Sequence, residues 1–196
     1  MSETHPAIPD ANDLSDDAVL RNTQRWFQRA VIGLNLCPFA KGAQSRDEIW
    51  WRVSAANTEE QLREDLIHTL RHMMAQDAKA IDTAVLIVPH VLQDFLDYND
   101  FLDEAEYIVQ ELQLEGVVQV ATFHPQYQFA DTASADISNA TNRAPYPILH
   151  LLREASVARA VDAFANAESI YERNIETMNR LGEAGWQKLF NDSPVD

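Results

Sequence analysis

The sequence feature that most constrains the fold is a pair of apolar runs separated by one long helical pattern. Residues 83–88 (TAVLIV) are apolar and stop at Pro89, which is typical of a strand buried on both faces. Residues 94–114 place apolar side chains at helical spacing, and residues 117–123 form a second strand-like run. A strand, a helix and a strand in succession predict parallel strands joined by a right-handed crossover.

A further strand is expected over residues 49–54 (IWWRVS), which are rich in aromatic and β-branched side chains. A helix is expected after it, over about residues 57–76, where Thr58 and Gln61 match a capping box. We therefore predict an α/β fold with a small three-stranded, mainly parallel sheet flanked by helices.

The C-terminal part of the sequence predicts additional helices. Residues 148–165 are apolar on almost every side, which is typical of a buried helix, and residues 167–190 predict one or two more. We expect one globular domain over residues 14–190. Residues 1–13, with two prolines and no periodicity, are expected to be a disordered arm, and residues 191–196 are expected to fray.

The charge and hydropathy of the chain narrow the class of protein. Lys and Arg total 15 against 31 Asp and Glu, and no cationic run offers a patch for nucleic acid or an anionic membrane. No apolar run reaches the roughly 18 residues that span a bilayer, and the N-terminus lacks the pattern of a signal peptide. A single cysteine excludes an internal disulfide. We expect a soluble, cytoplasmic protein whose partner is a small molecule.

About twenty residues after Phe123 lack helix or strand periodicity, and so long a connection is usually functional or disordered. This segment carries aromatic side chains, which disordered segments lack. His124 opens it at the carboxyl end of an expected strand, which is where parallel α/β sheets bind ligands. Arg143 near its end is suited to a carboxylate or phosphate. The candidate substrate-binding residues are Asn35, Tyr127, Asn139, Asn142 and Arg143.

His150 and Glu154 would lie one turn apart if residues 148–165 were helical. A carboxylate bonded to one imidazole nitrogen raises the basicity of the other, which suits a general base or a metal ligand. The alternative is a satisfied buried pair without chemistry. We predict one pocket formed by residues far apart in the sequence, with Cys37 at its wall: His124, Arg143, His150 and Glu154.

Cys37 precedes Pro38 in an apolar segment that cannot be regular helix. Most free cysteines are small buried hydrophobic residues. The alternative is a nucleophile, a redox thiol or a metal ligand, which requires a lowered thiol pKa. Because Pro38 places Cys37 in irregular backbone, we expect this thiol to be more accessible than a core cysteine.

A family resemblance is carried by three strings: GLNLCPFA (residues 33–40), QVATFHPQYQFA (residues 119–130) and NATNRAPYPILHLLREASV (residues 139–157). Together they resemble the bacterial family catalogued as domain of unknown function 1415, over nearly the whole chain apart from its termini. The resemblance implies no established activity. Ala144 stands where the family is expected to show serine, so a hydroxyl contact would be absent here.

The sequence leaves an enzyme and a binding protein open. The first expectation is an enzyme acting on a small polar or anionic substrate, with catalytic residues Cys37, His124, His150 and Glu154. The alternatives are a non-catalytic ligand-binding or assembly protein, and a metal- or haem-binding protein using His124, His150 and Cys37. The sequence has no phosphate-binding glycine loop and no GxSxG, HExxH or CxxC motif, so the reaction, cofactor, metal and oligomeric state remain open.

Overall fold

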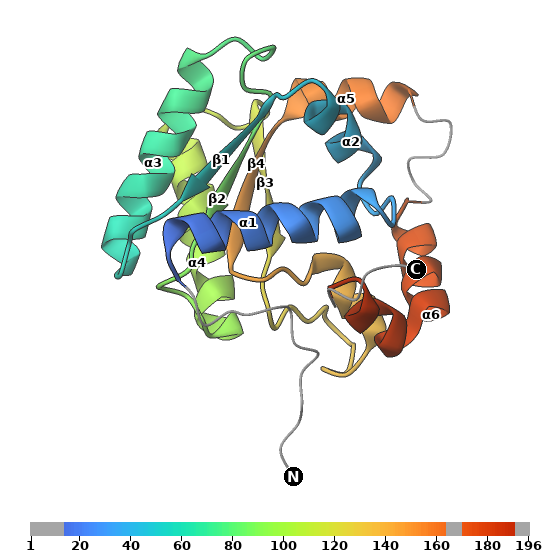
Figure 1. The fold of residues 1–196 in the computed structure, drawn as a ribbon. Helices are drawn as coiled ribbons and strands as arrows, with labels where there is room; N and C mark the ends of the chain where they lie inside the picture. The colour runs from blue at the N-terminus through green and yellow to red at the C-terminus, as the bar shows by residue number, and fades with distance from the viewer. Residues whose placement is uncertain (1–13, 164–169, 191–196) are drawn as a thin grey trace.

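The computed structural model describes residues 14–163 and 170–190, so the expected arm (residues 1–13) and frayed end (residues 191–196) lie outside the described residues. In the described part of the chain, helices flank a four-stranded sheet, which confirms the α/β class (Figure 1). None of the helices described is both long enough and apolar enough to cross a membrane.

The sheet is mixed and has the strand order β1-β2-β4-β3. Its strands are β1 (Ile49–Val53), β2 (Thr83–Ile87), β3 (Val118–Phe123) and β4 (Ile148–Arg153). β1 and β2 pair in parallel, whereas β4 pairs antiparallel with both β2 and β3. The three predicted strands therefore do run in one direction. The prediction of a three-stranded sheet is corrected, because β4 lies between β2 and β3.

β4 replaces the first part of the helix expected over residues 148–165. The helix in this region is α5 (Glu154–Ala163), which begins only after β4 ends. Ile148 to Leu151 are all buried, and a short run that is apolar on every side fits a buried strand as well as a buried helix. His150 and Glu154 therefore lie on two different elements and are not neighbours on one helical face.

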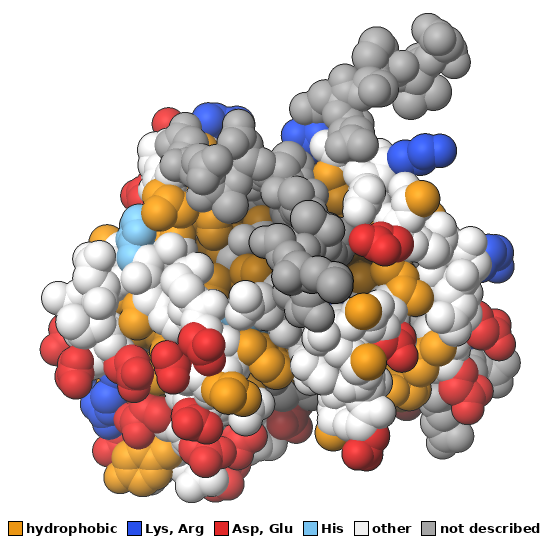
Figure 2. Space-filling view, turned by 90° about the horizontal axis from the view of Figure 1, so that it is seen from below, with side chains coloured by type: hydrophobic (Ala, Val, Ile, Leu, Met, Phe, Trp, Pro, Cys, Tyr) orange, Lys and Arg blue, Asp and Glu red, His pale blue; other side chains and the backbone are white. Residues whose placement is uncertain are grey.

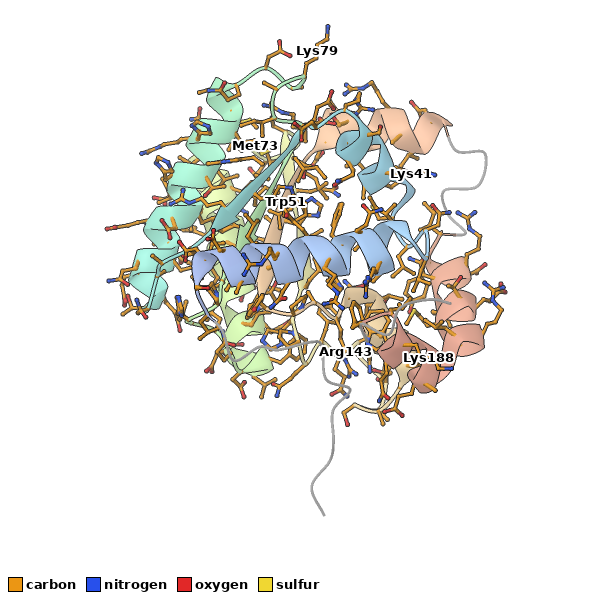
Figure 3. The ribbon with its side chains drawn as sticks, in the orientation of Figure 1. Lys41, Trp51, Met73, Lys79, Arg143 and Lys188 are labelled. Atoms are coloured by element: carbon orange, nitrogen blue, oxygen red, sulfur yellow. The ribbon has the colours of Figure 1, made fainter. Side chains whose placement is uncertain are left out.

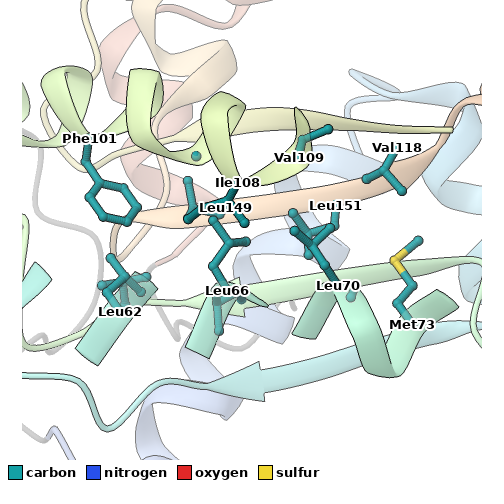
Figure 4. Close-up of a cluster of buried hydrophobic side chains, with 14 of the residues drawn as sticks. Leu62, Leu66, Leu70, Met73, Phe101, Ile108, Val109, Val118, Leu149 and Leu151 are labelled. Atoms are coloured by element: carbon teal, nitrogen blue, oxygen red, sulfur yellow. The ribbon is translucent and has the colours of Figure 1, made fainter. Parts of the chain in front are cut away.

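One face of the sheet is covered by α3 (Glu59–Ala75) and α4 (Phe95–Glu111). The predicted cap of α3 is confirmed, since the Thr58 hydroxyl accepts a hydrogen bond from the Gln61 backbone N–H at 3.3 Å. α3 has a buried stripe that faces α4 and β4 across an apolar core (Figure 4). The stripe consists of Leu62, Leu66, Leu70 and Met73.

The other face packs against a second apolar cluster, which includes Trp26, Phe27, Val85 and Ile148. The elements that contribute to it or surround it are α1 (Asp16–Trp26), the π-helical η1 (Phe27–Ile32), α2 (Pro38–Ser45), the 3-10 helix η2 (Ile137–Asn142) and α6 (Ile170–Lys188). The predicted C-terminal helix is present as α6, and Gly182 kinks it with φ at +63°. Residues on alternate positions of β2 and β4 thus serve two different cores.

Candidate functional site

His124 lies at the carboxyl end of β3, as expected, but both of its ring nitrogens are engaged. Nδ1 accepts a hydrogen bond from the Gln126 backbone N–H at 3.0 Å, so Nε2 carries the proton and donates to the Leu92 carbonyl oxygen at 3.1 Å. The ring packs against Phe95 and Tyr98 of α4. Burial is the main cause that lowers the His124 pKa below its usual value. His124 therefore fixes the start of the loop and has no lone pair left for a ligand.

Arg143 is also committed to the loop. Its Nε donates to the Tyr127 carbonyl oxygen at 3.1 Å and its Nη2 to the Ser134 carbonyl oxygen at 2.6 Å. The side chain is buried, and burial lowers its pKa. Figure 3 shows Arg143 among the loops at the end of the molecule away from Lys79. The Arg143 guanidinium therefore stabilises the loop by binding two of its backbone carbonyl oxygens.

Two asparagines that we expected to bind substrate close the same loop. Asn139 Oδ1 accepts from the Phe129 backbone N–H at 2.9 Å, and its Nδ2 donates to the Ala133 carbonyl oxygen at 2.9 Å. Asn142 Nδ2 donates to the Thr122 carbonyl oxygen at 3.1 Å, which ties the end of the loop to β3. These side chains replace the backbone hydrogen bonds that a segment without regular structure lacks.

A pocket of about 220 Å³ brings two of the predicted catalytic residues together, Cys37 and His150. It lies between the sheet, α2 and α5. These two helices lie on the other side of the sheet from α3 and α4 (Figure 1). Its walls are mainly apolar and include Phe27, Phe39, Ile49, Leu152, Val157 and Ala160. The expectation of one pocket for the whole predicted set is therefore corrected, because His124, Arg143 and Glu154 do not line this pocket.

His150 is oriented by Thr83, a residue that the sequence analysis did not select. The Thr83 hydroxyl lies 2.7 Å from His150 Nε2 and 2.7 Å from the Leu151 carbonyl oxygen. A hydroxyl has one proton, and a carbonyl oxygen can only accept. Donation to Leu151 leaves the Thr83 oxygen to accept from Nε2–H, so Nδ1 of His150 carries the lone pair.

The Nδ1 lone pair of His150 has no hydrogen-bond partner among the residues that the structure describes. Only 7% of the residue is exposed, and burial lowers its pKa to about 4. The imidazole is therefore neutral at neutral pH. A neutral imidazole with one free lone pair, in a pocket lined by apolar groups, is able to accept a proton from a neighbour.

Cys37 is partly buried and occupies the N-cap position of α2, with extended backbone at φ −130° and ψ 98°. Burial raises the pKa of its thiol, and the backbone N–H groups of Phe39 and Ala40 oppose this shift. The irregular backbone expected around Cys37 is present only up to this residue. Pro38 begins α2, so residues 38–40 are helical and the expectation is corrected there, because proline is compatible with the first turn of a helix. The thiol is nevertheless held in its protonated form, so the cysteine needs a base in order to react.

The opposite end of the pocket is polar. Arg46, Asp82, Arg153 and Ser156 line it, and none of them was selected from the sequence. The Ser156 hydroxyl donates a short hydrogen bond to Asp82 Oδ1. Arg153 donates hydrogen bonds to backbone carbonyl oxygens, from Nε to Ile81 at 3.1 Å and from Nη2 to Met73 at 2.6 Å. The charged groups of this end, Arg46, Asp82 and Arg153, come from three separate segments, which explains why no sequence motif revealed them.

The remaining predicted residues lie apart from the pocket. Asn35 is exposed in the turn before α2, with φ at +55°. Glu154 opens α5, where its backbone N–H bonds to the Val117 carbonyl oxygen at 2.9 Å. Over residues 14–163 and 170–190 no three side chains of His, Cys, Asp or Glu are grouped to hold a metal ion. His124 packs on the α4 side of the sheet, so the trio proposed for metal or haem does not assemble.

A second hollow, of about 500 Å³, lies beyond the carboxyl ends of the parallel strands. Open α/β sheets commonly bind their ligands at this edge. It is lined by Asn57 after β1, Pro89 and His90 after β2, and Pro125 after β3. The described residues that line this hollow include neither a thiol nor an ion pair. The pocket with Cys37 and His150 is therefore the stronger candidate for chemistry.

A comparison with protein-family models matches residues 18–188 to the family described as "Protein of unknown function (DUF1415)". A search of curated proteins found no match, and a search of solved structures found none either. The three strings that carry the resemblance include Cys37, His124, Arg143 and His150.

Proposed function

The chain belongs to the DUF1415 family, whose description assigns no activity, and from the geometry of the pocket we propose that the protein is an enzyme that uses the Cys37 thiol. The substrate is a small molecule bound in the pocket of about 220 Å³ between α2, α5 and the sheet. His150 acts as the general base, and Thr83 orients its ring. A nucleophile, a base and a third group that orients the base are the recurring parts of covalent catalysis.

The observation that carries the proposal is the fixed tautomer of His150. The Thr83 hydroxyl donates to Leu151 and accepts from His150 Nε2–H, each at 2.7 Å. This leaves the Nδ1 lone pair for the pocket that Cys37 also lines. A histidine in a purely structural role would be expected to use both nitrogens, as His124 does.

The proposed step transfers one proton and forms one bond. As Cys37 Sγ attacks an electrophilic carbon of the substrate, the thiol proton passes to His150 Nδ1. The bond to the leaving group breaks with its electron pair, and the leaving group then takes the proton from the imidazolium. The low pKa of His150, about 4, makes the imidazolium a strong acid toward the leaving group.

A second candidate is a non-catalytic binding protein for a small apolar molecule. The observation that favours it is the raised pKa of Cys37, because activated cysteines normally have a lowered thiol pKa. In that case the thiol and the imidazole serve only as walls of the pocket. The two candidates differ in whether Cys37 reactivity depends on His150.

The reaction of native protein with iodoacetamide at neutral pH tests this dependence. The chain has one cysteine, so all label reports on Cys37. We expect His150→Gln to lower the second-order rate constant at least about tenfold, since general-base assistance is commonly worth 10² or more. Thr83→Val, which removes the acceptor for Nε2–H, should lower it less. Mass spectrometry of the labelled protein measures the rates.

His90→Gln is the matched control, because His90 lines the other hollow and lies outside this pocket. It should leave the rate unchanged. Circular dichroism of each variant checks the fold, and unfolded protein gives the intrinsic rate of the thiol. Equal rates for the native chain and His150→Gln would show that His150 is not the general base and would favour the hypothesis of a binding protein.

A further inference from the structure

The reactive pocket is elongated along α2. Cys37 comes immediately before this helix and Arg46 immediately after it, and both line the pocket. Eight residues at about 1.5 Å each make the helix about 12 Å long. Phe39, Ala40 and Ala43 line the pocket between these ends. Cys37 and Arg46 therefore lie at opposite ends of a helix that forms one wall of the pocket.

The two carboxylates at the Arg46 end already have donors. Arg46 Nε lies 2.7 Å from Glu48 Oε2, and Arg46 Nη2 lies 3.6 Å from Asp82 Oδ2. The Ser156 hydroxyl donates to Asp82 Oδ1, and Arg159 Nη2 donates to Ser156 Oγ at 2.8 Å. Glu48 and Asp82 are both buried. They therefore act as internal partners and offer little to a ligand cation.

Cations outnumber carboxylates in the hollow next to the Arg46 end of the pocket. This hollow, of about 450 Å³, shares Arg46 and Asp82 with the pocket and is also lined by Glu48, Lys79 and Arg159. Lys79 and Arg159 are exposed, and neither has a carboxylate partner in the described part of the chain. Three cations against two carboxylates reverse the balance of a chain whose net charge is −16.

Lys79 projects from the end that carries α2 and α5 (Figure 3). The side seen from below gathers acidic side chains and shows few cations (Figure 2). An anion is therefore repelled less at the three cations of this hollow than at the acidic side seen in Figure 2.

Gly42 gives the Arg46 guanidinium its place beside the pocket. A Cβ added at Gly42 would lie 3.2 Å from Arg46 Nη1. Both residues line the pocket. The absence of a side chain at Gly42 thus lets the arginine fold back over α2, toward Asp82.

We infer that the ligand of this pocket is a small amphiphilic monocarboxylate. Its apolar body lies along α2, its carboxylate meets Arg46 and Arg159, and its other end reaches Cys37 and His150. The volume of about 220 Å³ equals that of roughly seven waters at about 30 Å³ each, which suits a short fatty or aromatic acid. The inference rests on the proposed function only for the reaction at the thiol end.

Calorimetry of the full chain with octanoate tests the ligand class, with 1-octanol and octylamine as neutral and cationic analogues. We expect octanoate to bind and both analogues to bind at least about tenfold more weakly, as for the loss of one charge-assisted hydrogen bond. Arg159→Gln should weaken octanoate binding about tenfold, and Arg159→Lys should restore part of the loss. Lys41→Gln removes a charge from the exposed side of α2 outside the pocket and should change nothing.

Gly42→Ala changes the position of Arg46 without changing any charge. Alanine in place of glycine favours the helix, so the melting temperature should rise by about 2–4 °C. The new Cβ would lie 3.2 Å from Arg46 Nη1, and this flexible end can shift by a few tenths of an ångström, so octanoate binding should weaken about threefold at most. Thermal unfolding and calorimetry on one preparation measure the two opposite effects.

Protection of Cys37 from iodoacetamide by octanoate shows whether the acid occupies this pocket. Protection that is lost in Arg159→Gln supports the inference. Octanoate binding that is independent of Arg159, binding without protection, or equal binding of octylamine would each overturn it. Arg159-dependent binding together with unchanged labelling in His150→Gln would keep the ligand class and remove the thiol chemistry. The two proposals therefore fail through different measurements.

Discussion

Acidification from about pH 8 to about pH 4 should cost the folded protein about 3 kcal/mol of stability through His150 alone. Burial lowers the pKa of this imidazole from 6.5 to about 4 in the folded chain. The unfolded chain therefore takes up a proton below about pH 6.5, whereas the folded chain does so only near pH 4. The stabilisation is present in full above pH 6.5 and is lost as the pH falls toward the folded pKa.

Urea unfolding at several pH values measures this loss. His150→Gln removes the titrating group, so its stability should fall less steeply over the same pH range, by about 3 kcal/mol in total. Burial also lowers the pKa of His124, so that residue contributes in the same direction and remains in the variant. Parallel pH profiles for the two proteins would mean that the pKa of His150 is the same in the folded and unfolded chains, so that burial would not keep the ring neutral below about pH 6.5.

The order of strands and helices followed from the sequence where periodicity and length agreed. The runs that became β1, β2 and β3 are short, rich in β-branched or aromatic side chains, and bounded by Pro89, Gly116 or a helix cap. β4 was missed because ILHLLR runs directly into the helical α5. Nothing in the local pattern marks the change at Glu154, since the pairing with β2 and β3 that makes it a strand is a long-range contact.

The candidate site was predicted in part, although by a different geometry. Cys37 and His150 were expected near one pocket and do line one, but His150 reaches it from β4 and its partner is Thr83. Thr83 stands at the start of an apolar strand, where a threonine needs no special explanation. Arg46 and Asp82 lie 36 residues apart in the sequence and meet only in the fold. Residues that are far apart in the sequence and meet only in the fold do not form a motif with a recognisable spacing.

His124 and Arg143 illustrate the opposite limit. Both stand at distinctive places in the sequence, at the two ends of a long loop, and position alone suggested chemistry. The structure shows that a loop of this length, with few backbone ladders, takes its hydrogen bonds from buried side chains instead. A polar residue in such a loop can either satisfy the hydrogen bonds of the loop or bind a ligand, and the sequence alone does not distinguish these two roles.

Arg143→Met should lower the stability by about 2–4 kcal/mol, because it leaves two carbonyl oxygens without donors. Those oxygens belong to Tyr127 and Ser134, at 3.1 and 2.6 Å from the guanidinium. Urea unfolding measures the loss, and hydrogen exchange should locate it in residues 124–142. Arg71→Met, at an exposed helical position, should cost only tenths of a kcal/mol. If Arg143→Met instead kept its stability and lost octanoate binding, Arg143 would be an anion anchor, as its place in the sequence first suggested.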